Sequence, residues 1–181
     1  MKEKEDFSKF GKSFQEDLCH LILKDRPFAD QMFEVLDIRF LELNHLRVFV
    51  RMVKKYRERY GVHPTKKTMT SVIRNGLGEE NDSTQILVRD YYTRILSEDL
   101  EVDGSEYIKD TSLDFCKKQK LKEAILKSVG LIKSSSFDSV AKVINDALKL
   151  GCSNDLGYDY MADFEERFLV KARNPSRTGW K

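Results

Sequence analysis

Glycine and proline are scarce in this chain, with nine glycines and three prolines among 181 residues. Sandwiches and barrels of many short strands need more turn residues than this. No segment shows the apolar/polar alternation of a half-buried strand, whereas apolar residues recur every three or four positions along most of the chain. The sequence therefore predicts an all-α fold.

The first predicted unit is a small helical head, residues 1–78. Its first helix is expected to begin at Ser13, because Ser13 and Glu16 have the spacing of a capping box. Three further helices follow by their start and stop signals. In chain order these signals are Asp25-Arg26-Pro27, the cap Asn44, the stop Gly61 and the cap Thr65.

The second predicted unit, residues 79–134, is a long antiparallel helical hairpin with arms over about residues 83–98 and 105–133. The first arm repeats Leu87, Tyr91 and Ile95 at intervals of four. A similar stripe on the second arm consists of Leu121, Ile125, Val129 and Ile132.

A tethered amphipathic linker helix is predicted within residues 135–152, after the serine run 134–136. Five apolar residues fall on one of its faces: Val140, Val143, Ile144, Ala147 and Leu148. Folding back into one bundle would bury this face. A helix that is flexibly tethered at both ends is better suited to a groove on a partner, and we favour that interpretation.

Patterns that would indicate catalysis, nucleotide binding or metal binding are absent from the sequence. His20, His45 and His63 have no histidine or cysteine at metal-ligand spacing, and the three cysteines form no disulfide or zinc pattern. No glycine-rich phosphate loop is present. The sequence thus identifies no catalytic, cofactor-binding or metal-ligating residue.

The strongest nucleic-acid candidate is "RMVKKYRERYG", residues 51–61, in which basic side chains alternate with tyrosines. Lys54, Lys55 and Arg57 are its candidate DNA contacts, because such a mixture can bind phosphates and stack bases. The simpler interpretation is an exposed helix side, and we favour it, since 32 basic and 30 acidic residues leave a net charge of only +2.

The charged N-terminus is not a signal peptide, and no stretch is long and apolar enough to cross a bilayer. These features predict a soluble intracellular protein without a membrane partner.

Two stretches near the end resemble a known family. "GYDYMADFEERF" (157–168) is similar to the segment that follows the linker helix in bacteriophage DnaB-like, T4-type hexameric replicative DNA helicases. "RTGW" (177–180) resembles the start of their RecA-like ATPase domain. The opening "FGKSFQEDLCHLILKDRPFADQM" is similar in style to the first helices of their N-terminal head.

The resemblance implies a role in DNA replication in the cytoplasm of an infected bacterial host. In that family, head and hairpin form a collar in which hairpins pair subunits. The resemblance therefore implies that the stripe Leu121, Ile125, Val129 and Ile132 is the candidate pairing surface. The linker helix docks on a neighbouring ATPase domain, which makes Val140, Val143, Ile144, Ala147 and Leu148 its candidate contact residues. Residues 153–181 would lead into the absent ATPase domain. That domain would bind ATP and magnesium and would make most of the contacts with single-stranded DNA. The chain alone is expected to have no ATPase activity.

The expected partners are a second copy of the chain and a primase or helicase loader. The full-length parent would form hexamers, and the fragment would be a dimer or monomer. Two alternatives stay open: a stand-alone helical replication-accessory or loader adaptor without a motor domain, and a direct DNA-binding module.

Overall fold

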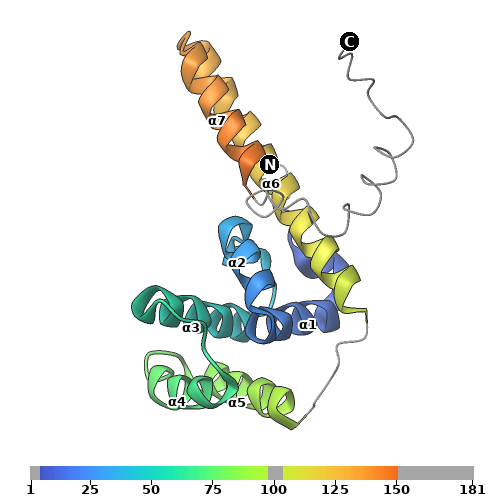
Figure 1. Ribbon diagram of the computed structural model, residues 1–181, viewed down its shortest axis with the longest axis vertical. Coiled ribbons are helices and arrows are strands. Elements are labelled where there is room, and N and C mark those ends of the chain that lie inside the picture. Colours follow the sequence, from blue (N-terminus) through green and yellow to red (C-terminus); the bar gives the residue numbers. More distant parts are fainter. Residues whose placement is uncertain (1–4, 98–103, 151–181) are drawn as a thin grey trace, which may run out of the picture. The chain divides into compact units, whose positions relative to one another are not determined.

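A computed structural model describes residues 5–97 and 104–150. Within those ranges the chain contains helices and no strand, so the all-α prediction is confirmed (Figure 1). The elements are η1 (Phe7–Phe10), α1 (Gly11–Lys24), α2 (Arg26–Val35), η2 (Ile38–Phe40), α3 (Asn44–Tyr60), α4 (Lys66–Gly76), α5 (Asp82–Ser97), α6 (Ser105–Lys133) and α7 (Phe137–Lys149). The predicted segment 153–181 lies outside the described residues.

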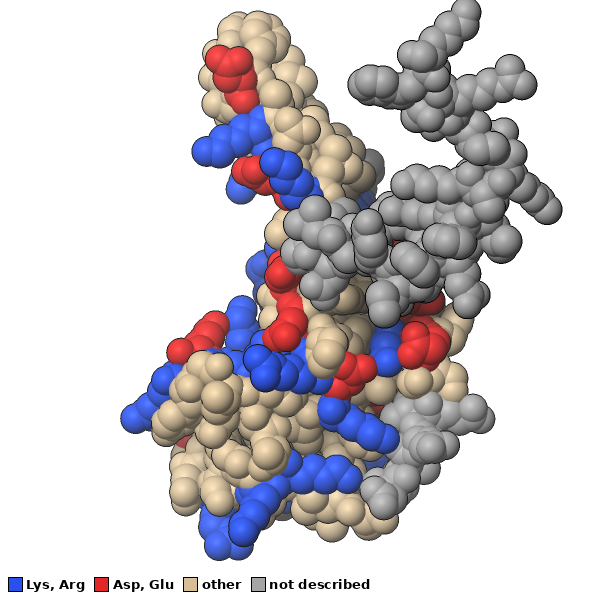
Figure 2. Space-filling view, viewed as in Figure 1, with Lys and Arg blue, Asp and Glu red and all other residues tan. Residues whose placement is uncertain are grey.

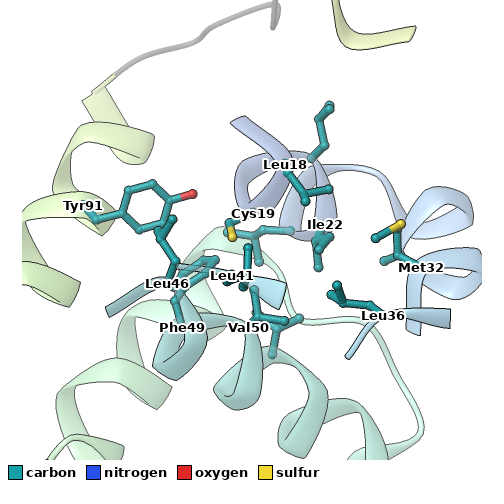
Figure 3. Close-up of a cluster of buried hydrophobic side chains, with 14 of the residues drawn as sticks. Leu18, Cys19, Ile22, Met32, Leu36, Leu41, Leu46, Phe49, Val50 and Tyr91 are labelled. Carbon is teal, nitrogen blue, oxygen red and sulfur yellow. The ribbon is translucent and has the colours of Figure 1, made fainter. Parts of the chain in front are cut away.

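The head encloses a continuous hydrophobic core. Side chains from α1, α2, α3 and α5 and from the segments between them converge on one cluster, and the labelled members in Figure 3 are Leu18, Cys19, Ile22, Met32, Leu36, Leu41, Leu46, Phe49, Val50 and Tyr91. All of them are buried. Burial of a large apolar side chain contributes about 1.5–3 kcal/mol, so this cluster dominates the stability of the head.

Two of the predicted helix signals are confirmed. Thr65 caps α4 by accepting a hydrogen bond from the Thr68 amide at 3.2 Å. Gly61 ends α3 in the left-handed conformation, with φ of 68°, and its amide donates to the Arg57 carbonyl at 2.8 Å.

Two other predicted caps are wrong. Helix α1 begins at Gly11, so Ser13 lies inside it and its hydroxyl donates to Asp17 at 3.3 Å. Helix α3 begins at Asn44 without a side-chain cap, and the Asn44 amide group instead donates to the Thr84 hydroxyl at 3.2 Å. A long-range contact between α3 and α5 thus replaces the local cap.

The predicted pairing of residues 83–98 with 105–133 is also corrected. Helix α5 packs against α3, and its Val88, Tyr91 and Ile95 belong to the head core. The Tyr91 hydroxyl donates to the Glu16 carbonyl at 2.7 Å, which ties α5 to α1. The head core therefore continues beyond residue 78, the predicted end of the head. The apolar face of α5 is covered by the head and is not available to α6.

Helix α6 joins two environments. Its first half packs on α1 and α2, and Phe115 contacts Phe7 and Phe40 with ring centroids 4.6 and 5.5 Å apart. Its second half packs along α7, which folds back after a short turn (Figure 1). The helical hairpin of this chain is thus α6–α7, and not the predicted pair α5 and α6.

Candidate functional site: the α6–α7 hairpin

The turn between α6 and α7 is closed by backbone hydrogen bonds. The Ser135 amide donates to the Ile132 carbonyl and the Ser136 amide to the Leu131 carbonyl, both at 3.0 Å. Ser135 has a φ of 56°, in the left-handed region. This combination is a Schellman motif, a well-defined helix end. The serine run, predicted to be a flexible linker, is therefore an ordered turn.

The second half of α6 and helix α7 bury few side chains, and those they bury are small. Ala124 and Ser128 are buried one turn apart on α6, and the Ser128 hydroxyl donates to the Ala124 carbonyl at 2.8 Å. No residue of α7 is fully buried. Two helices packed on each other without further layers cannot enclose large apolar residues.

Large apolar side chains consequently lie open along the hairpin. Their exposed fractions range from 50% for Ile125 and Val129 to 68% for Phe137. On the second half of α6 and on α7 these side chains are Ile125, Leu126, Val129, Ile132, Phe137 and Leu148. On the face seen in Figure 2, the hairpin shows uncharged surface together with several charged side chains. A group of exposed large apolar side chains on two packed helices is typical of an interaction site.

The two predicted interface sets are brought together on this one hairpin. Of the α6 set, Leu121 is half-buried, whereas Ile125, Val129 and Ile132 are exposed. On α7, Leu148 is exposed, and the rest of the set, Val140, Val143, Ile144 and Ala147, is half-buried. Helix α7 forms as predicted, but it packs on α6, so it is not a free tethered helix.

The predicted DNA contacts separate into different environments. Arg57 pairs with Asp30 across the head, donates to His63 Nδ1 at 3.1 Å and lies over the Phe33 ring. The Lys54 Nζ atom lies 4.0 Å from Oε1 of Glu58. Lys55 is exposed and lines a groove between α3 and α4. Arg57 therefore has a structural role, and Lys55 remains available to a ligand.

The three histidines are partly or fully buried in the head. His63 Nε2 donates to the Leu23 carbonyl at 2.8 Å, and because Arg57 can only donate, His63 Nδ1 accepts from it at 3.1 Å. Partial burial lowers the pKa of His45 below its usual value. His20 is buried on α1. Within the described ranges, no group of three or more histidine, cysteine, aspartate or glutamate residues could hold a metal ion.

The two described cysteines are core residues. Cys19 and Cys116 are free thiols and buried. Burial raises the pKa of Cys19 far above its usual range and that of Cys116 to about 12. Both therefore stay protonated at neutral pH and are poor nucleophiles.

Among the described helices, none combines the length and the apolar character needed to cross a membrane. No protein-family model matches the chain, and no curated protein matches its sequence.

Proposed function

We propose that the chain is the N-terminal collar and linker part of a bacteriophage replicative DNA helicase and that it mediates subunit association. The single observation that carries the proposal is the apolar surface of the α6–α7 hairpin, on which six large side chains are 50–68% exposed. In this proposal the hairpin pairs with the hairpin of a second copy.

A second copy is the occupant that fits this surface best. Both helices of the hairpin expose large apolar side chains, so a two-fold axis would place matching surfaces against each other. Two hairpins packed in this way form a four-helix bundle, in which each helix gains the neighbours that a two-helix layer lacks. The Schellman turn holds α7 on α6, so little conformational entropy is lost on association.

The test is a substitution in the middle of the α6 stripe. Ile125→Asp with Val129→Asp places two carboxylates one turn apart on the proposed contact surface. Because charged groups in an apolar interface are not compensated, we expect dissociation to monomers, with association weakened at least about 100-fold. Sedimentation velocity across a concentration series measures the effect.

A matched control comes from α5. Ile86 and Leu87 are 57% and 49% exposed, much like Ile125 and Val129, but they lie on the head. Ile86→Asp with Leu87→Asp makes the same chemical change and should leave self-association intact. If this control dissociates the protein as strongly as the α6 variant, the hairpin is not the interface.

The remaining parts of the proposal rest on the resemblance of residues 157–168 and 177–180. They are hexamer formation in a full-length parent, binding of primase or helicase loader, ATP- and magnesium-dependent unwinding by a motor domain, and action in the cytoplasm of the infected host. The chain itself should not hydrolyse ATP in the presence of single-stranded DNA. Turnover above a no-protein blank in a phosphate-release assay would contradict this proposal.

One observation favours the alternative of a stand-alone replication-accessory adaptor. Helix α7 packs on α6 of its own chain, whereas a linker helix of the collar type would reach a neighbouring subunit. The two functions differ in self-association. An adaptor would use the same apolar surface for a different protein and would remain monomeric alone, so the sedimentation series distinguishes them.

A further inference from the structure

Positive charge is concentrated in one segment of the head. Residues 44–76, which span α3 and α4, contain nine basic residues and a single acidic one, Glu58, for a net charge of +8. The other 148 residues contain 23 basic and 29 acidic residues, for a net charge of −6. The near-neutral total therefore conceals a strongly basic region.

A groove of about 500 Å³ lies between α3 and α4 in this basic region. Each helix contributes one face, with residues spaced by three or four positions. Helix α3 provides Met52, Lys55, Tyr56, Arg59 and Tyr60, and α4 provides Thr68, Ser71, Val72, Asn75 and Gly76. Among residues 5–97 and 104–150, no acidic side chain lines the groove.

Aromatic rings form part of the groove wall. The Tyr56 and Tyr60 ring centroids are 4.6 Å apart at an interplanar angle of 39°, and the Arg59 guanidinium lies 5.5 Å from the Tyr60 ring. Tyr60 is 55% exposed. Opposite the rings, the polar side chains of Thr68, Ser71 and Asn75 can donate hydrogen bonds.

A second cavity on the head has the opposite character. It is lined by Asp30, Glu34 and Glu58 together with Arg26, Lys54 and Arg57. There the charges neutralise one another, as in the pair between Arg57 and Asp30. Lys55 and Arg59, in contrast, form no ion pair with another described residue. The α3–α4 groove thus keeps its positive charge available to an anion.

We infer that the groove between α3 and α4 binds single-stranded nucleic acid. Lys55 and Arg59 would contact backbone phosphates, and a base would stack on Tyr60, as in other sites that combine basic and aromatic side chains. A duplex fits less well, because its bases are already stacked and cannot reach a tyrosine ring. The inference does not depend on the α6–α7 hairpin, since no residue of the groove lies on that hairpin.

The experiment measures fluorescence anisotropy of labelled oligothymidylate and oligouridylate, each about fifteen nucleotides long, with the full chain at about 50 mM salt. This length covers most of the range of about 4–16 nucleotides that single OB-fold domains occupy on a single strand. Lys55→Glu with Arg59→Glu should weaken binding at least tenfold. It should also reduce the slope of log K against log salt by about 1.4, which corresponds to two lost phosphate contacts. The two probes separate DNA from RNA as the source of the shared chemistry.

Three controls make the inference falsifiable. Lys12→Glu with Arg89→Glu makes the same change of charge at exposed positions on α1 and α5 and should weaken binding less than threefold. Tyr60→Leu should weaken binding about fivefold or more, whereas Tyr60→Phe, which keeps the ring, should stay within twofold. A duplex of the same length should bind at least tenfold more weakly.

Any of three results overturns the inference. The first is no binding of either single strand at 50 mM salt. The second is equal loss of affinity in the groove variant and in the α1/α5 control, which would indicate a general effect of charge. The third is a result that excludes stacking, which can be seen either as equal affinity for duplex and single strand or as equal loss for Tyr60→Leu and Tyr60→Phe.

Discussion

The head and the α6–α7 hairpin both carry regular apolar stripes, but only the head encloses its stripe. Leu18 and Ile22 on α1 are completely buried, whereas Ile125 and Val129, also four residues apart on one helix, are each 50% exposed. The difference lies in the number of neighbouring helices. Helix α1 contacts α2, α3 and α6, while the second half of α6 has α7 beside it.

An amphipathic pattern identifies the face of a helix that needs a partner, but not the partner itself. Helix α7 has the clearest apolar stripe of the chain, yet none of its residues is fully buried. Helix α5 has a less regular stripe, yet Val88, Tyr91, Tyr92 and Ile95 are all buried. In our account the head is stabilised within one chain and the hairpin by a second copy.

The largest expected effect comes from removing an aromatic ring of the core. Phe115 is 4% exposed and contacts Phe7, Phe10 and Phe40. Phe115→Ala should lower the free energy of unfolding by about 3–5 kcal/mol in urea denaturation. Phe137→Ala, a matched change at a 68% exposed position on α7, should cost less than about 0.5 kcal/mol in the monomer. Equal costs would remove the distinction between the two regions.

A smaller effect is expected at the hairpin turn. Ser135 has a left-handed φ of 56°, which costs a residue with a Cβ atom roughly 1 kcal/mol and glycine very little. Ser135→Gly should therefore stabilise the hairpin by up to about 1 kcal/mol. The measurement is hydrogen exchange, in which the backbone amides of α7 should exchange more slowly. Ser134→Gly, at a φ of −94°, should give no such gain. A loss of protection in Ser135→Gly would mean that the turn does not hold α7.

The smallest effect concerns the contact between the start of α6 and the head. Burial raises the pKa of Asp25, but the hydrogen bond from the Phe28 amide and the ion pair with Lys109 at 2.9 Å outweigh it, so the pKa lies below its usual value. A depressed carboxylate stabilises the fold above its unfolded pKa of about 3.9, and this stability is lost as the pH falls through the folded value.

Asp25→Asn tests this linkage because asparagine can still cap α2 while the charge is lost. At pH 7 we expect a loss of about 0.5–1 kcal/mol, in the range of partly exposed ion pairs. The difference from the unaltered protein should disappear as the pH falls below about 4. A constant difference from pH 7 to pH 3 would show that the charge of Asp25 does not contribute.

Local signals made much of the fold predictable. The scarcity of glycine and proline predicted an all-helical chain, and Thr65 and Gly61 act as the sequence predicts because caps and stops depend on neighbouring residues. Long-range choices were not predictable. Asn44 bonds to Thr84, and Tyr91 bonds to Glu16, partners 40 and 75 residues away. These contacts draw α5 into the head and leave α6 to pair with α7.

The residues of the candidate surfaces could also be predicted only in part. The sequence indicated the stripe on α6, but not the exposed Leu126 and Phe137, which lie outside its four-residue repeat. It also grouped Arg57 with Lys54 and Lys55. Arg57 differs because Asp30, 27 residues earlier, lies within reach of its side chain only in the folded head. The residues that α4 contributes to the groove could not be predicted from the basic segment, residues 51–61.

The most direct test of the central claim is the molar mass of the unaltered chain by light scattering over a series of dilutions. If the α6–α7 hairpin pairs two copies, the mass should rise with concentration from 21.1 kDa to about twice that value. The Ile125→Asp, Val129→Asp variant should stay at the monomer mass throughout. A constant 21.1 kDa for the unaltered chain up to about 100 μM would contradict the claim.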